Sequence, residues 1–127
     1  MTYLLDTATL LWAVAAPDRL SARSRKLIEA GTHTLVVSIA SLWEITVKAQ
    51  KGLLAMSDPV VWLKAGVSSV NAELISIHAS HVYALNQLPD IHRDPFDRIL
   101  IAQALTEGWP LITSDATVRR YPAPTVW

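Results

Sequence analysis

Short apolar runs alternate along this chain with longer segments that carry helix signals, and this alternation constrains the fold most. Residues 34–37, Thr-Leu-Val-Val, are continuously apolar or β-branched, as in a strand that is buried on both faces. Asp58-Pro59 and Asp94-Pro95 each place a capping residue before a proline, which is typical of the first turn of a helix. Strands that alternate with helices are usually parallel and joined by right-handed crossovers. The sequence therefore predicts a three-layer α/β domain.

The expected elements cover most of the chain. Apolar runs predict strands over Tyr3–Leu5, Thr34–Val37, Leu74–Ile77 and Pro110–Thr113, with a small edge strand at Val126–Trp127. Helices are expected over Ala8–Ala15, Ala22–Ala30, Ser38 or Ser41 to Lys51, Pro59–Val67, Ala79–Leu88 and Pro95–Glu107. We expect residues 1–127 to form a single domain with a short, mostly parallel central sheet flanked by helices.

Composition favours one compact cytoplasmic domain. The chain has 127 residues, 51% of them hydrophobic, which is enough for a substantial core. No apolar run approaches the length of a membrane span, and Asp6 interrupts the layout of a signal peptide, so no membrane association is expected. The absence of Cys excludes disulfides and thiolate metal sites. The 11 basic and 11 acidic residues balance, so overall positive charge cannot drive nucleic-acid binding.

Four carboxylates stand where an expected strand ends or where a helix begins: Asp6, Glu44, Asp97 and Asp115. Asp6 and Asp115 each follow a strand, and ligands of parallel sheets bind outside the carboxyl ends of the strands. Glu44 and Asp97 lie in the early turns of their helices. We therefore expect all four to face one crevice.

Each of these residues also has a structural explanation. Asp6 can cap a helix, Asp97 can form a capping arrangement with Asp94, and Asp115 can be a turn residue. Glu44 can form a surface ion pair with Lys48, worth ~0.3–0.5 kcal/mol. The group as a whole is harder to explain in this way.

Two carboxylates about 5 Å apart repel by roughly 3 kcal/mol at an effective dielectric constant near 20, so a cluster of four requires compensation. Oxygen ligands without Cys or a histidine cluster favour Mg²⁺ or Mn²⁺ over Zn²⁺. The spacing of the histidines does not suggest metal ligation, and structural roles are expected for His33, His78, His81 and His92. Trp12 and Trp43 lie beside Leu and Ile, which favours core packing.

Four segments, Leu4–Thr7, Ser38–Ile45, His92–Ala104 and Leu111–Asp115, resemble in this order the PIN-domain family. More narrowly, they are similar to the VapC-type toxin ribonucleases of type II toxin–antitoxin systems. The Asp-Pro-Phe-Asp-Arg block at 94–98 and the Thr-Ser-Asp ending at 113–115 are the most specific parts.

The resemblance implies an endoribonuclease that depends on Mg²⁺ or Mn²⁺. Asp6 and Asp97 match the principal metal ligands, and Glu44 and Asp115 complete the acidic site. It also implies an RNA substrate, a homodimer and a small cognate antitoxin whose C-terminal segment covers the active site. Hydroxyl positions that line the family's pocket match Thr7, Thr113 and Ser114, whereas Asp94 matches a helix cap.

In the expected reaction, a metal-activated water attacks the phosphodiester in line, and Arg93, Arg98 or Lys48 is a candidate for contact with flanking phosphates.

One alternative is a non-catalytic acidic module that binds a cationic partner. Another is a receiver-type phosphoacceptor, which requires an adjacent acidic pair after the first strand and a Lys after the last. Neither Leu5-Asp6-Thr7 nor Thr113-Ser114-Asp115 supplies these residues.

Overall fold

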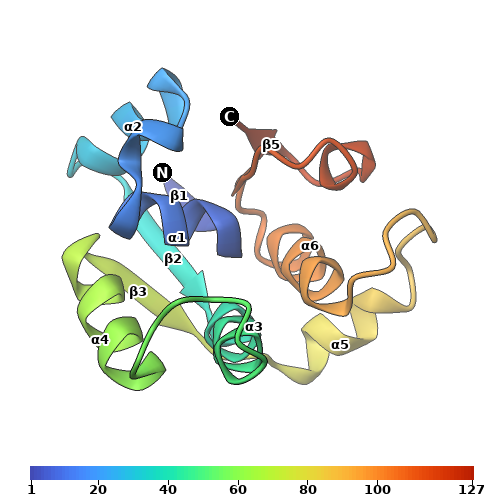
Figure 1. The fold of residues 1–127 in the computed structure, drawn as a ribbon. Helices are drawn as coiled ribbons and strands as arrows, with labels where there is room; N and C mark the ends of the chain where they lie inside the picture. Colours follow the sequence, from blue (N-terminus) through green and yellow to red (C-terminus); the bar gives the residue numbers. More distant parts are fainter.

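A five-stranded parallel sheet forms the centre of the molecule (Figure 1). The computed structural model describes residues 1–127. The strands lie in the spatial order β3-β2-β1-β4-β5, and every neighbouring pair is parallel. Their bounds are β1 (Thr2–Leu5), β2 (Thr34–Ser38), β3 (Ala72–Ile75), β4 (Leu111–Ile112) and β5 (Thr125–Val126). The expected short parallel sheet is confirmed, including the small strand at its edge.

Helices fill the connections between the strands. They are α1 (Thr7–Ala15), α2 (Ala22–Glu29), α3 (Ile39–Gln50), α4 (Pro59–Ser69), α5 (Ala79–Leu85) and α6 (Pro95–Glu107). Two short 3₁₀ turns, η1 (Pro17–Arg19) and η2 (Val118–Arg120), were not predicted from the sequence. No helix has both the length and the apolar character needed to cross a bilayer.

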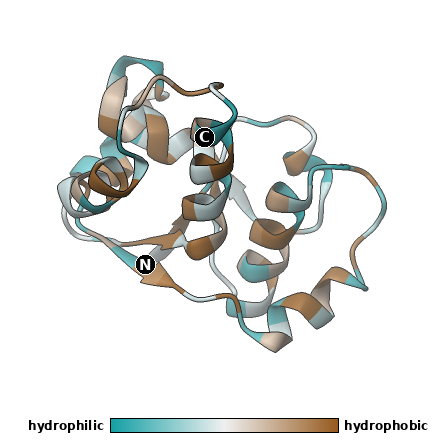
Figure 2. Cartoon of the chain, turned by 60° about the horizontal axis from the view of Figure 1, so that its bottom comes forward, coloured by the Kyte–Doolittle hydropathy of each residue, from teal (hydrophilic) through white to brown (hydrophobic).

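The central strands β1 and β2 are buried, because their side chains alternate between clusters of core residues on the two faces of the sheet. Tyr3 and Leu5 of β1 pack in one cluster with Leu10 of α1 and Leu63 of α4. Leu4, between them, packs in the other cluster with residues of α6 and η2. Figure 1 accordingly shows α2 and α4 on one side of the strands and α5 and α6 on the other. Hydrophobic stretches run through the strands and alternate with hydrophilic ones along the helices (Figure 2).

Some sequence-based expectations need correction. The third strand covers Ala72–Ile75 rather than Leu74–Ile77, and it begins directly after Asn71, whose φ of 53° ends the preceding turn. The helix after it ends at Leu85 instead of Leu88. Trp43 is 60% exposed and packs edge-on against Phe96, so its expected burial in the core is wrong.

The strand order places a topological switch point between β1 and β4. From β1 the chain proceeds to β2 and β3 on one side, and it later returns to β4 and β5 on the other side. The connections leaving β1 and β4 therefore separate at the carboxyl ends of the strands, where α/β sheets bind ligands. Asp6 directly follows β1, and Asp115 lies three residues beyond β4.

Candidate active site

All four predicted carboxylates reach one cavity of about 290 Å³ near this switch point. Asp6 comes from the end of β1, Glu44 from α3, Asp97 from α6 and Asp115 from the loop after β4. The other residues that line the cavity are Thr7, Ala8, Leu11, Lys48, Asp94 and Ser114. Segments up to 109 positions apart in the sequence thus contribute acidic side chains to one small volume.

Asp6 is both the N-cap of α1 and a wall of the cavity. Its Oδ1 accepts a hydrogen bond from the backbone N–H of Thr9 at 2.8 Å. The side chain is buried, and burial raises the pKa of the Asp6 carboxyl, although hydrogen bonds from Thr113 and Thr9 oppose the shift. Because the cap hydrogen bond uses one carboxylate oxygen, capping and a role in the site are compatible.

Asp97 lies in the first turn of α6, which Asp94 caps by accepting a hydrogen bond from the Phe96 N–H at 2.9 Å. Burial, together with the nearby charges of Asp94 and Glu44, raises the pKa of Asp97 to about 7. Asp94 therefore has the expected capping role and also adds negative charge to the cavity.

Glu44 forms the ion pair that its spacing from Lys48 suggests, but its carboxylate is buried, being only 4% exposed, rather than lying at the surface. Its Oε2 lies 2.6 Å from Lys48 Nζ, and this hydrogen bond raises the pKa of the lysine. Its Oε1 is buried and has no hydrogen-bond partner. A buried carboxylate oxygen without a partner is costly unless another group compensates its charge.

The remaining predicted residues fall into two groups. Thr7 donates a hydrogen bond to Ser41 Oγ at 2.9 Å, Thr113 Oγ1 accepts one from the Asp115 N–H at 3.1 Å, and the exposed Ser114 lines the cavity. Arg93 is exposed and does not line the cavity. Arg98 is also absent from its lining, since its guanidinium donates to Tyr121 Oη and to the carbonyls of Pro89 and Leu85.

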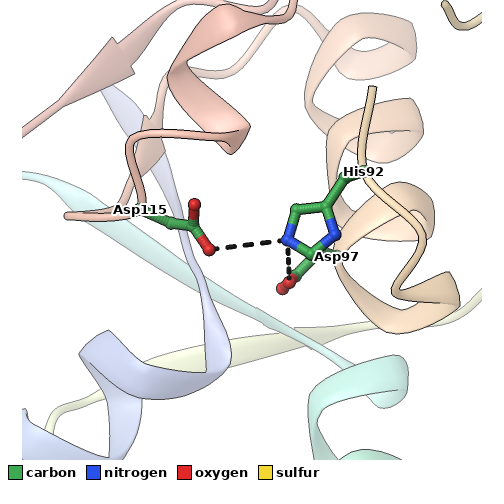
Figure 3. A group of neighbouring side chains, drawn as sticks. All are labelled: His92, Asp97 and Asp115. Atoms are coloured by element: carbon green, nitrogen blue, oxygen red, sulfur yellow. Dashed lines mark ion pairs between the residues drawn. The ribbon is translucent and has the colours of Figure 1, made fainter. Parts of the chain in front are cut away.

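His92 belongs to the same cluster, contrary to the structural role expected for it. Its Nε2 lies 3.0 Å from Oδ2 of Asp97 and 3.5 Å from Oδ2 of Asp115 (Figure 3). The imidazole is 20% exposed. A sequence signal for this position exists: His92 precedes the Asp94-Pro95 helix start by two residues, so it must lie near the first turn that carries Asp97.

The possible ligand atoms around the cavity suit a divalent cation. They are mainly carboxylate oxygens, the ligands that Mg²⁺ and Mn²⁺ prefer, and one of them is the unpartnered Glu44 Oε1. Burial first, and then the neighbouring carboxylates of Asp94 and Glu44, raise the pKa of Asp97, so a cation bound here would favour its charged form. His92, Asp97 and Asp115 also bring one possible ligand atom each within 4.8 Å of one another.

Fold, switch point and acidic cavity together define a PIN-domain protein. Residues 3–124 match the PIN domain, and the chain belongs to this family, as the sequence motifs indicate. Within it, the chain is 34% identical to Ribonuclease VapC22 of Mycobacterium tuberculosis, and the alignment covers 99% of this chain and 98% of that protein.

Solved structures share the fold. One is VapBC2 from Rickettsia felis bound to a DNA fragment from its promoter, with a TM-score of 0.78 and 18% identity over 100% of this chain and 99% of that chain. Another is DNA-bound VapBC from Salmonella typhimurium, with a TM-score of 0.72 and 16% identity over 100% and 97% of the two chains. The expected PIN-like three-layer architecture is thereby confirmed.

Proposed function

We propose that this protein is a metal-dependent endoribonuclease of the VapC type, the toxin of a toxin–antitoxin pair. The observation that carries the proposal is the convergence of Asp6, Glu44, Asp97 and Asp115 on one cavity at the switch point of the sheet. Membership of the PIN-domain family and the similarity to a protein named as a ribonuclease support it.

In this proposal, Asp6 and Asp97 are the principal ligands of Mg²⁺ or Mn²⁺, and Glu44 and Asp115 complete the site. A bound ion of this kind supplies Lewis-acid polarisation of a phosphodiester and lowers the pKa of a water molecule. The protein itself provides orientation. The Thr9 N–H fixes the Asp6 carboxylate, Lys48 fixes Glu44, and the Thr7–Ser41 hydrogen bond joins α1 to α3.

Two exposed groups beside the cavity are proposed to contact RNA phosphates. Ser114 lines the cavity and offers a hydroxyl, while the Arg93 guanidinium is exposed one residue before the cap of α6. Arg98 is not proposed for this role, because its guanidinium already anchors the preceding loop.

Replacing Asp6 with Asn tests the proposal. Asn caps helices as well as Asp does, so the Asp6→Asn protein should fold, whereas the loss of one ligand charge should lower metal-dependent RNA cleavage at least about 100-fold. Cleavage of a labelled RNA with Mg²⁺ or Mn²⁺, and its inhibition by EDTA, is the measurement. Asp58→Asn is the matched control, since Asp58 caps α4 but does not line the cavity.

Undiminished cleavage by the Asp6→Asn protein would contradict the assignment of the site. An absence of EDTA-sensitive cleavage by the wild-type protein would instead favour the non-catalytic binding module. Circular dichroism of both variants separates loss of activity from loss of fold.

A cognate antitoxin protein and a homodimeric assembly are part of the proposal. The neighbours in fold include proteins described as VapBC complexes, which motivates the antitoxin partner. Sedimentation analysis of the purified chain, alone and after co-expression with the product of an adjacent small reading frame, tests both expectations. A monomer that gains no partner would contradict them.

A further inference from the structure

His92 is held by two hydrogen bonds that are independent of the carboxylates, one to its ring and one from its backbone. Its Nδ1 accepts a hydrogen bond from the backbone N–H of Asp94 at 3.1 Å. Its own backbone N–H donates to Tyr121 Oη at 2.7 Å. Tyr121 is 4% exposed and belongs to the core beneath the loop. The position of the ring is therefore fixed by the start of α6 and by the core.

The hydrogen bond to Nδ1 also determines which nitrogen carries the proton. An imidazole nitrogen that accepts a hydrogen bond is unprotonated, so the proton of the neutral ring is on Nε2. This is the nitrogen that contacts Asp97 and Asp115 (Figure 3). The ring thus presents a positively polarised N–H to the two carboxylates rather than a lone pair.

This tautomer opposes metal ligation by His92. Nε2 can bind a metal only when it is unprotonated, which moves the proton to Nδ1 and leaves the Asp94 N–H facing another donor. Asp115, in addition, already uses Oδ1 to accept hydrogen bonds from the Thr117 and Val118 N–H groups at 2.8 and 3.2 Å. Its Oδ2, the remaining oxygen, is the atom that lies near His92.

We propose that the Nε2–H of His92 competes with the divalent cation for the Oδ2 atoms of Asp97 and Asp115. His92 is therefore a determinant of metal affinity and not a metal ligand. The inference rests on the proposed metal site, but it concerns a residue outside the four carboxylates. Metal binding has to displace the Nε2–H contacts, so the imidazole raises the metal concentration at which the site fills.

Two substitutions separate the hydrogen bond accepted by Nδ1 from the contacts made by Nε2. In His92→Asn, the side-chain oxygen can still accept the Asp94 N–H, as in an Asx turn, but no group reaches Asp97 or Asp115. In His92→Gln, the longer side chain can place an amide N–H near the former Nε2. The matched control is His33→Asn, because His33 precedes β2 at the opposite end of the sheet.

The experiment measures Mn²⁺ affinity by EPR titration and calorimetry, without RNA. A hydrogen bond to a charged group contributes about 1.5–3 kcal/mol, so we expect His92→Asn, which lacks the Nε2–H contacts to Asp97 and Asp115, to bind Mn²⁺ about tenfold more tightly than the wild type. His92→Gln should lie closer to the wild type, and His33→Asn should equal it. Pulsed EPR of the wild-type complex should show no directly coordinated nitrogen.

Weaker or unchanged Mn²⁺ binding by His92→Asn, or a directly coordinated ¹⁴N in the wild type, would overturn this inference while leaving the proposed metal site intact. Absence of Mn²⁺ binding by the wild-type protein would overturn both. Thermal unfolding with EDTA and with Mn²⁺ checks that the variant is folded: a folded variant should gain more stability from Mn²⁺ than the wild type does.

Discussion

Three of the carboxylates at the cavity each combine a structural and a candidate functional role. Asp6 and Asp94 cap helices, and Asp115 accepts two backbone N–H groups of the turn that follows it. In each case the backbone N–H groups are accepted by one oxygen of the carboxylate, Oδ1. These residues therefore do cap helices or stabilise a turn, as their positions in the sequence suggest. These structural roles do not exclude a functional role.

Asp97 differs because no backbone N–H compensates its charge, and this predicts a pH dependence of stability. Its pKa of about 7 in the folded protein lies above the ordinary value of 3.8. Between these values the folded state binds the proton more tightly than the unfolded state does, so stability falls as pH rises from about 4 to about 7. The penalty at higher pH is at most about 4 kcal/mol and smaller where water screens the group.

Asp97→Asn should remove this penalty. In EDTA, the variant should be more stable than the wild type by roughly 1–3 kcal/mol at pH 8, and the difference should vanish near pH 4. Urea unfolding at several pH values measures it, with the exposed Asp90→Asn as the control. If the difference in unfolding free energy between Asp97→Asn and the wild type does not change with pH, burial does not destabilise the ionised carboxyl.

At the scale of elements, Tyr121 connects the end of η2 to the loop that precedes α6. Its hydroxyl accepts hydrogen bonds from the N–H groups of Ile91 and His92 at 3.3 and 2.7 Å, and from Arg98 Nη1 at 3.0 Å. The loop that carries His92 is thereby fixed to the core.

Removal of this hydroxyl should destabilise the protein measurably. In Tyr121→Phe the His92 N–H loses its acceptor, which costs about 1–3 kcal/mol when a donor remains buried and unpaired. Chemical denaturation measures the loss. Tyr83→Phe is a suitable control, because Tyr83 is 73% exposed. Equal stabilities of the two variants would contradict the anchoring role.

The elements that the sequence predicts best are those with complete local signals. Helix α6 has Asp94 as its cap, Pro95 at its first position and Gly108 with a φ of 73° after its end, and its bounds agree with the expectation. Strand β3 has no such signals. Its register follows from pairing with β2, where Leu35 faces Ala72, and this long-range contact leaves no local trace in the apolar run at 74–77.

The residues of the candidate site likewise differ in whether the sequence alone predicts them. Asp6, Glu44, Asp97 and Asp115 can be found from the sequence because they stand at element boundaries that topology brings together. The position of the His92 ring depends on Tyr121, 29 residues later, and on the Asp94 N–H. The exposure of Trp43 depends on which face of α3 meets the sheet. Tertiary contacts of this kind are not encoded in local patterns.

At the scale of the whole molecule, we propose that residues 1–127 form a single domain. The central strand β1 contributes residues to the core clusters on both faces of the sheet, so the two clusters share one element. Chemical unfolding should therefore follow one cooperative transition, with coincident fluorescence and circular dichroism curves. Two separated transitions would contradict a single domain.

The central position of β1 also has a consequence for the nascent chain. During synthesis, β1 can pair with β2 as soon as Ser38 is available, but its other edge stays unpaired until β4 has been translated. Asp97 and Asp115 likewise join Asp6 only at that stage. A ribosome making this protein would thus carry an incomplete acidic site until codon 115 has been read, so an RNA-cutting product could not act on its own message before that point.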